Sequence, residues 1–160
     1  MKNFTVMIGA ALTSLLLGCS STPVAVAPIG PNPVIPGKRA GNGQLEVFSA
    51  LRGHSEGNNP CWYQHTAYYI RDHQGRPVKR VDNRVGRYAQ APRVINLPPG
   101  EYLVKAQAKD YLWVDVPVVI EPGKLTEVHL DDAWRPANAR NTELVSLPVG
   151  NPVGWWTDVK

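Results

Sequence analysis

The stretch PPGEYLVKAQAKDYLWVDVPVVIEPGKLTEVHLD, from Pro98 to Asp131, decides the fold. Apolar side chains recur in it at every second position. Such a period of two is typical of strands with one buried and one wetter face, because successive side chains point to opposite sides of a sheet. Turn residues at 109–110 and 122–124 divide the stretch. The pattern therefore predicts three consecutive antiparallel strands, over 101–109, 112–121 and 125–130.

Two residues of this stretch carry further expectations. Pro117 has no N–H to donate to a neighbouring strand, so its strand should lie at a sheet edge or be bulged there. His129 alternates with Val128 and Leu130. We therefore expect His129 on the wetter face of its strand, where nothing suggests that it binds a metal.

Outside this stretch the same kind of pattern predicts more strands and no helix. We expect strands at 45–52, 65–71, 76–81 and 94–97, with a hairpin turn at 72–75 and one further strand at 143–147. The 160 residues include 15 Pro and 14 Gly. That density of proline excludes a mainly helical protein, because proline costs about 3 kcal/mol in a helix interior. The expected fold class is all-β.

A known family resembles the central part of the chain. The carrying residues are the run VINLPPGEYLV at 94–104, Tyr111, the apolar block 116–119, the turn PGK at 122–124 and Val128. Together they resemble carboxypeptidase-regulatory-like and PEGA-type domains. The resemblance implies a small antiparallel, transthyretin-like (prealbumin-like) β-sandwich of about seven strands. It also implies an accessory, adhesive or carbohydrate-contacting role without catalysis, although fold alone does not fix function.

The first residues have the pattern of a targeting segment. Lys2 precedes a largely apolar run from Phe4 to Leu17, which is too short for a membrane span and typical of a secretory signal peptide. The run ends in Leu-Leu-Gly-Cys at 16–19, which resembles the lipobox of bacterial lipoproteins. The resemblance implies removal of residues 1–18 and acylation of Cys19. Because Ser20 follows, and not aspartate, it also implies an outer-membrane location.

The chain then divides into three further parts. Residues 19–43 are rich in proline and glycine, and we expect them to form an extended tether without a packed core. Residues 44–131 form the sandwich, and the tail at 132–160 is apolar enough to dock on it. With Cys19 acylated, Cys61 has no intramolecular partner for a disulfide.

Charge and aromatic residues supply the candidate binding residues. Residues 38–93 hold ten Lys and Arg against four Asp and Glu, so this half would attract anionic partners. Exposed aromatic rings stack on sugars or anchor protein interfaces. The candidates are Arg76, Lys79, Arg80, Arg84, Arg87, Trp113, Trp155 and Trp156. Two alternatives stay open: a solvated basic loop without a partner, and a tail that folds back over Trp113.

The sequence thus predicts a non-enzymatic binding or accessory module of the cell envelope, lipid-anchored and without a cofactor. Its expected partners are the membrane and an envelope protein or polysaccharide, and not nucleic acid. One alternative is a structural subunit that pairs through an exposed sheet edge. Another is a metal or thiol site that uses His54, Cys61 and His65, although their spacing matches no zinc signature. The chain has no nucleophile-elbow motif and no phosphate-binding loop.

Overall fold

A computed structural model describes residues 24–33, 41–55, 57, 62–86, 90–136, 139–140 and 143–157. Its elements are β1 (Val24–Ala25), β2 (Ile29–Gly30), β3 (Gly43–Phe48), β4 (Leu51–His54), β5 (Trp62–His65), β6 (Tyr68–Asp72), β7 (Pro77–Val81), β8 (Ile95–Leu97), β9 (Gly100–Gln107), the 3-10 turn η1 (Lys109–Tyr111), β10 (Trp113–Ile120), β11 (Leu125–His129), β12 (Leu144–Ser146) and β13 (Pro152–Trp156). No helix among the described residues is both long and apolar enough to cross a membrane.

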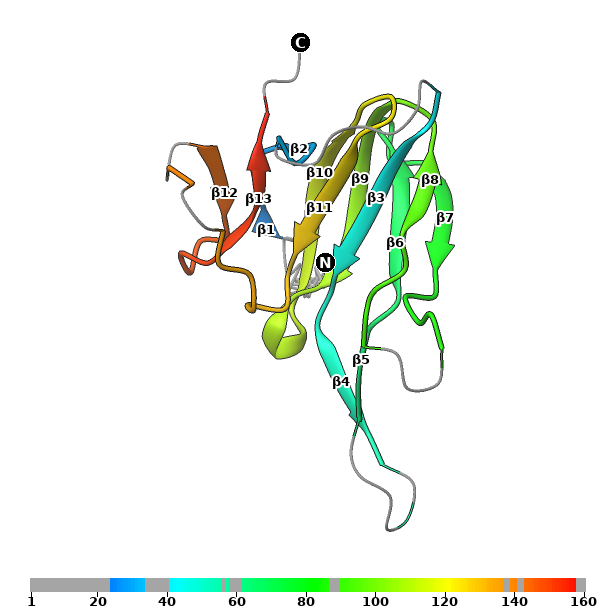
Figure 1. Cartoon of the computed structure of the whole chain (residues 1–160), viewed down its shortest axis with the longest axis vertical. Coiled ribbons are helices and arrows are strands. Elements are labelled where there is room, and N and C mark those ends of the chain that lie inside the picture. The colour runs from blue at the N-terminus through cyan, green and yellow to red at the C-terminus, as the bar shows by residue number, and fades with distance from the viewer. Residues whose placement is uncertain are drawn as a thin grey trace, which may run out of the picture.

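The strands form two main sheets that pack face to face (Figure 1). The larger sheet has the order β12-β13-β2-β10-β9-β6-β7, with β1 added beside β10, and the smaller one has the order β11-β3-β8. The expected all-β sandwich is confirmed. Its described strands number thirteen rather than about seven, because short strands before residue 43, a separate β4–β5 pair and the tail all add to it.

The core lies between the two sheets and comes from the alternation that the sequence displays. Along β10 the buried side chains are every second one, Val114, Val116, Val118 and Ile120. Leu45 and Val47 of β3 face them from the smaller sheet and are also buried. Burial of such side chains contributes roughly 1.5–3 kcal/mol each, so this layer is the main source of stability.

The expected run of three antiparallel strands holds for only two of them. β9 and β10 pair antiparallel over their full length, from Trp113 opposite Gln107 to Ile120 opposite Gly100. β11 instead crosses to the smaller sheet and pairs parallel with β3. The other edge of β10 is already occupied by β1 and β2, so the third strand has no free edge to join. The prediction of one three-stranded antiparallel unit was therefore wrong.

Pro117 shows how β10 can be paired on both edges and still contain a proline. β1 pairs with Val114 and Asp115, and β2 pairs with Val118, so neither short strand pairs opposite Pro117. Proline has no N–H to leave unpaired in such a gap. The expected sheet edge is thus replaced by a gap between two short neighbouring strands.

The N-terminal segment corrects the expectation of a free tether. Ile29 of β2 is fully buried and belongs to the core. The backbone N–H of Asn32 donates to Leu125 O at 2.9 Å, so the segment also reaches the smaller sheet. Residues 24–33 are therefore part of the sandwich, because β1 and β2 pair with β10 and β2 also pairs with β13. Pairing between segments so far apart in the chain leaves no local pattern.

The tail lies against this same segment. β13 pairs with β2 and with β12, and Val153 and Val145 are buried in the core. Gly154 packs so closely on Ile29 that an added Cβ would lie 2.5 Å from Ile29 Cγ2. The tail and the N-terminal segment thus complete the larger sheet together on the side of β10 away from β9.

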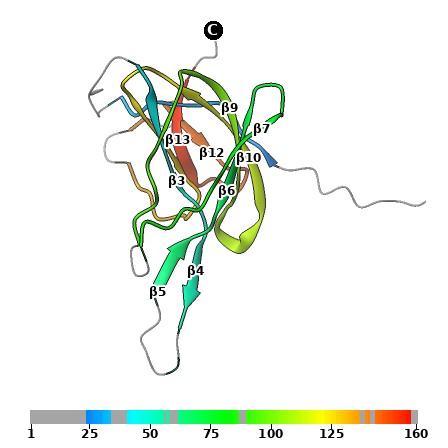
Figure 2. The same ribbon diagram turned by 90° about the vertical axis from the view of Figure 1, so that its right-hand side faces the viewer.

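β4 and β5 form a two-stranded ribbon that projects from one end of the sandwich, as both ribbon views show (Figures 1 and 2). The sequence predicted a strand through residue 52 and a loop from His54, so the ribbon was missed as an element. Its base is fixed by backbone hydrogen bonds: Ala50 N donates to Gln107 O at 2.7 Å, and Thr66 N donates to Ala50 O at 2.9 Å.

A candidate binding site: a basic groove beside the β4–β5 ribbon

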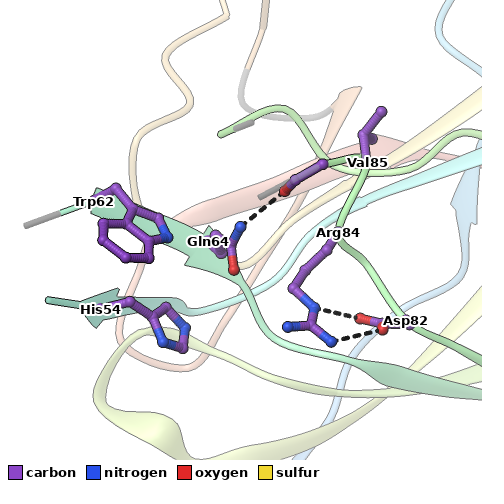
Figure 3. A pocket seen from close by; sticks show the side chains of 7 residues that line it. His54, Trp62, Gln64, Asp82, Arg84 and Val85 are labelled. Atoms are coloured by element: carbon purple, nitrogen blue, oxygen red, sulfur yellow. Dashed lines mark hydrogen bonds and ion pairs between the residues drawn. The ribbon is translucent and has the colours of Figure 1, made fainter. Parts of the chain in front are cut away.

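One groove runs between the ribbon, the outer edge of the larger sheet and the loop that follows β7. It consists of two adjoining hollows of about 450 and about 310 Å³ that share His54, Gln64, Asp82 and Arg84. We call this site the basic groove; its defining residues are Arg52, His54, Gln64, Tyr69, Arg80, Asp82, Arg84 and Trp113. Figure 3 shows the side chains that surround the larger hollow.

Two aromatic rings form the floor of the groove. Tyr69 of β6 and Trp113 of β10 keep 41% and 42% of their surface exposed. Their ring centroids lie 6.2 Å apart with a tilt of 44°. Strand alternation explains the exposure, because Tyr68 and Val114, their neighbours in the chain, take the buried face. The described strands of the tail, β12 and β13, lie on the other side of β10 in the sheet order, and Trp113 stays exposed beside them.

Three arginines and one aspartate supply the charge. Arg84 donates to Asp82 through Nε and Nη2, each at 3.0 Å, and this pair holds the pKa of the Asp82 carboxyl below its usual range. Within the described residues neither Arg52 nor Arg80 makes an ion pair. The groove therefore carries excess positive charge, with two guanidinium groups available for a ligand.

A buried asparagine fixes the wall that carries Arg84. Asn83 is almost completely buried, and its Nδ2 donates to Val47 O at 2.7 Å and to Ser49 Oγ at 3.2 Å. Its Oδ1 accepts a hydrogen bond from Arg93 N at 2.9 Å. The residues on either side of Asn83 in the chain, Asp82 and Arg84, are thereby held facing the groove.

The ribbon forms the opposite wall. His54 and Trp62 are directly opposite each other and stack, with centroids 6.0 Å apart. Gln64, on the same face of the ribbon, donates from Nε2 to Gly86 O at 2.9 Å, which ties the ribbon to the loop after β7 (Figure 3). Aromatic, amide and guanidinium groups thus surround one cavity, and such a combination can both stack on a ligand and hydrogen-bond its hydroxyl or carboxyl groups.

The histidines do not gather into a metal site in the described part of the chain. His65 is buried, and its Nδ1 lies 2.6 Å from Ser49 O, so that nitrogen is used within the fold. Among the described residues no three His, Cys, Asp or Glu side chains come together as they would around a metal. Cys61, the thiol of the metal or thiol alternative, lies outside the described residues.

His129 is not on a wet face, as the sequence predicted, but buried. Its ring stacks between Phe48, at 4.3 Å, and Trp134, at 4.4 Å. Trp134, the residue that covers His129, belongs to the tail, so the alternation along β11 could not reveal it. Burial, and secondarily the nearby His65, lowers the pKa of His129 to about 4.

The structure brings only part of the predicted binding set together. Arg80, Arg84 and Trp113 line the basic groove. The others lie elsewhere: Arg76 pairs with Asp72 in the β6–β7 turn at 2.6 Å, Lys79 is on β7 outside the groove lining, Trp155 and Trp156 are on β13, and Arg87 is outside the described residues.

Sequence reasoning missed four groove residues, Arg52, Gln64, Tyr69 and Asp82. Tyr69 carried a usable signal, because it alternates with Tyr68 and Ile70 in a predicted strand. Arg52 and Gln64 belong to the ribbon, whose pairing across a loop left no short-range pattern.

In comparisons with known proteins, no family model, no curated protein and no solved structure matches this chain.

Proposed function

We propose that this protein is a lipid-anchored, non-enzymatic binding module of the cell envelope that takes a sugar chain in its basic groove. The observation that carries the proposal is the groove floor, where Tyr69 and Trp113 stay exposed beside Arg52 and Arg80, two arginines that make no ion pair with any residue that the structure describes. Aromatic faces stack on the apolar faces of sugar rings, and the arginines Arg52 and Arg80 supply hydrogen-bond donors for hydroxyl or carboxylate oxygens.

The size of the groove favours a few sugar units over a flat protein surface. Ligand pockets typically enclose about 300–1,000 Å³, and the larger hollow of about 450 Å³ falls in this range. A stable protein interface would instead require roughly 800 Å² from each partner. The excess of arginine over aspartate favours sugars that carry carboxylate or phosphate groups.

Two further parts of the proposal rest on resemblance. The lipobox-like residues 16–19 support acylation of Cys19, and Ser20 after the cysteine supports an outer-membrane location. The run 94–104 supports a likeness to transthyretin-like accessory domains. A module of this kind would keep a sugar polymer close to the membrane that holds its anchor.

Binding is tested with peptidoglycan fragments, lipopolysaccharide, a uronic-acid polymer and a neutral glucan, titrated by calorimetry. We expect at least one of the acidic polymers to bind and the neutral glucan to bind more weakly. Trp113→Ala should weaken binding by about tenfold, since a stacked ring contributes on the order of 1–1.5 kcal/mol. Arg80→Glu should weaken it by at least as much, because it replaces an attractive charge by a repulsive one.

Each variant has a matched control on the same protein. Trp156→Ala removes a tryptophan of similar exposure from β13, outside the groove, and Lys79→Glu makes the same charge change one residue away from Arg80. Equal losses from Lys79→Glu and Arg80→Glu would show that only overall charge attracts the polymer. Unchanged binding in Trp113→Ala would remove the groove from the proposal.

Anchoring is tested separately by Cys19→Ser. We expect the variant to leave the membrane fraction or to remain unprocessed, and the wild type to carry acyl chains on Cys19 by mass spectrometry. A variant that fractionates and migrates like the wild type would contradict lipid anchoring without bearing on the groove.

A further inference from the structure

The chain between Cys19 and the folded domain is very short. Val24 of β1 lies beside Val114 of β10, in parallel orientation. Five residue steps separate Cys19 from Val24, and five steps of fully extended chain span at most about 18 Å. A free tether over 20–43 would allow roughly 70 Å at full extension. Adjacent strands lie about 5 Å apart, so an anchor on Cys19 keeps the beginning of β10 within about 23 Å of the anchored cysteine.

An unusual apolar surface lies at this same end of the larger sheet. Leu112, which directly precedes β10, is 65% exposed, and Val149 of the β12–β13 connection is 78% exposed. They are the two most exposed large apolar side chains among the described residues. Both border one crevice of about 250 Å³, together with Leu147 and Pro148. We call Leu112, Leu147, Pro148 and Val149 the apolar end.

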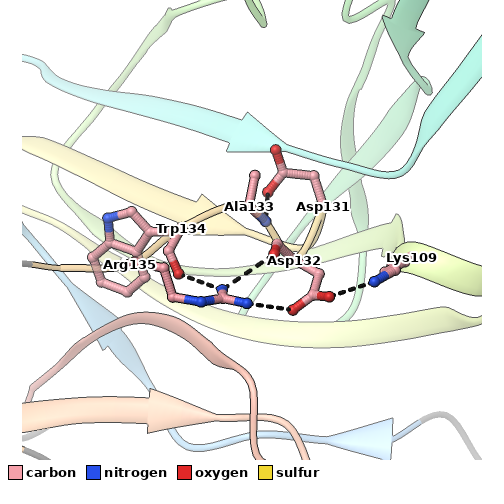
Figure 4. Close-up of polar contacts among 6 residues, drawn as sticks. All are labelled: Lys109, Asp131, Asp132, Ala133, Trp134 and Arg135. Atoms are coloured by element: carbon pink, nitrogen blue, oxygen red, sulfur yellow. Dashed lines mark hydrogen bonds and ion pairs between the residues drawn. The ribbon is translucent and has the colours of Figure 1, made fainter.

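The backbone around the apolar end is held in place by charged side chains. Lys109 Nζ lies 2.5 Å from Asp132 Oδ2, and Arg135 Nη1 donates to the carbonyl oxygens of Asp132 and Trp134 (Figure 4). Asp110 and Asp132 both have positive φ, 70° and 62°, and both line the crevice. Aspartate is one of the few L-residues that adopt this conformation, and Leu112 follows the turn at Asp110. Val149 lies in a different turn, beside Gly150, whose φ is 92°.

The charges around the crevice do not favour anionic headgroups. Lys109 and Arg135 carry two positive charges, and Asp110, Asp131 and Asp132 carry three negative ones. Attraction to anionic headgroups therefore contributes little, and any affinity for a lipid surface must come from the apolar side chains.

We infer that the apolar end is a membrane-contact surface: Leu112 and Val149 rest in the interfacial layer of the bilayer that anchors Cys19. The inference rests on the proposed lipid anchoring and adds the orientation of the domain, which is held against the membrane and not raised above it. The anchor already holds the domain close to the bilayer, so two apolar side chains that bind lipid only weakly by themselves are enough to set the orientation of the domain.

The test uses the mature, acylated protein reconstituted in phosphatidylethanolamine–phosphatidylglycerol vesicles that contain bromine-labelled lipid as a contact quencher. In a Cys61→Ser background, Val149→Cys carries a fluorophore, and Val78→Cys carries the same fluorophore as the matched control. Val78 is also exposed and apolar, but it lies on β7, the opposite edge of the sheet. We expect about a twofold loss of emission at position 149, because interfacial side chains reach about 5–10 Å into the headgroup and acyl boundary.

The outcomes separate this inference from the anchoring. If Cys19 carries acyl chains and the probe at position 149 is quenched no more than the probe at 78, the membrane contact is wrong and the anchoring stands. If mass spectrometry finds Cys19 unmodified, both are wrong. Quenching at position 149 should persist in 1 M salt, and its loss there would show that charge, not the apolar end, holds the domain on the vesicle. In Leu112→Ser the quenching should decrease, whereas Val94→Ser, a change at an exposed valine outside the apolar end, should leave it unchanged.

Discussion

Ile29→Ala tests whether the N-terminal segment belongs to the core. Ile29 is 0% exposed, and its strand β2 pairs with β10 on one side and with β13 on the other. Removing a buried isoleucine down to alanine costs about 2–5 kcal/mol, from lost burial and from the cavity that remains. A free tether would instead make the substitution nearly neutral, within about 0.5 kcal/mol.

Gly154→Ala sharpens this test, because the structure gives the contact that it would create. A Cβ on Gly154 would lie 2.5 Å from Cγ2 and 2.8 Å from Cδ1 of Ile29, and 3.1 Å from Glu127 O. Overpacking of this kind costs about 1–3 kcal/mol. In the Ile29→Ala background the two closest atoms are absent, so most of that cost should disappear. We expect the double variant to be more stable than the sum of the single changes by about 1–2 kcal/mol.

The assay is urea unfolding of the mature protein, followed by tryptophan fluorescence, with the free energy of unfolding extrapolated to water. Val78→Ala, at an exposed valine of β7, is the matched control and should shift that free energy by less than about 0.5 kcal/mol. An Ile29→Ala variant as stable as this control would refute the assignment of residues 24–33 to the sandwich. Strict additivity of Ile29→Ala and Gly154→Ala would refute the contact between β2 and β13.

Three further changes test other parts of the structure. Asn83→Ala should lower the free energy of unfolding by about 2–4 kcal/mol in urea unfolding, since it leaves buried backbone groups unpaired. The control Asn96→Ala, at an exposed asparagine with one 3.5 Å hydrogen bond, should change that free energy by less than about 0.5 kcal/mol. The pKa of His129 is lowered to about 4 in the folded protein, so between about pH 6.5 and pH 4 the unfolded chain binds a proton that the folded protein does not. The free energy of unfolding should therefore fall by up to about 3 kcal/mol as the pH is lowered from about 6.5 to about 4. His129→Phe should lack this part of the pH dependence. Gly43→Ala should destabilise β3 by about 1–3 kcal/mol or more in the same unfolding assay, since a Cβ there would lie 2.3 Å from the backbone oxygen of Glu121, and a variant as stable as the wild type would contradict the close approach of β3 to this turn.

Alternation along the chain was enough to predict the strands but not their partners. The predicted buried face of the strand at 112–121 was 112, 114, 116, 118 and 120. Val114, Val116, Val118 and Ile120 are buried as predicted, because successive side chains of a strand point to opposite faces. Leu112 was predicted wrongly: it precedes β10 and is 65% exposed. The sheet that β11 joins depends on which edges are already occupied, and β1 and β2 had occupied the edge of β10. Pairing of that kind is non-local and leaves no periodic signal.

The candidate site likewise contains some residues that the sequence predicted and others that it did not. Arg80 and Arg84 were predicted from the local excess of positive charge, and Trp113 from the exposed face of its strand; the groove contains all three. Arg52 and Gln64 were missed because they reach the site on a ribbon whose two strands meet across residues 55–61. His129 was placed on the wrong face because the residue that covers it, Trp134, lies in the tail.

The sequence by itself determined the all-β class, the positions of most strands and turns, and which side chain of each neighbouring pair is buried, because these follow from local backbone geometry and from proline and glycine chemistry. It also determined the candidate anchor at Cys19, which depends only on a contiguous motif. The tertiary structure alone decided that residues 24–33 join the core, that β11 changes sheets, and that three arginines, Tyr69 and Trp113 enclose one groove. Those outcomes depend on which surfaces meet when segments far apart in the chain pack together. Hydrophobic burial is non-directional and stabilises any complementary pair of apolar surfaces, so the local sequence does not show which pair will form.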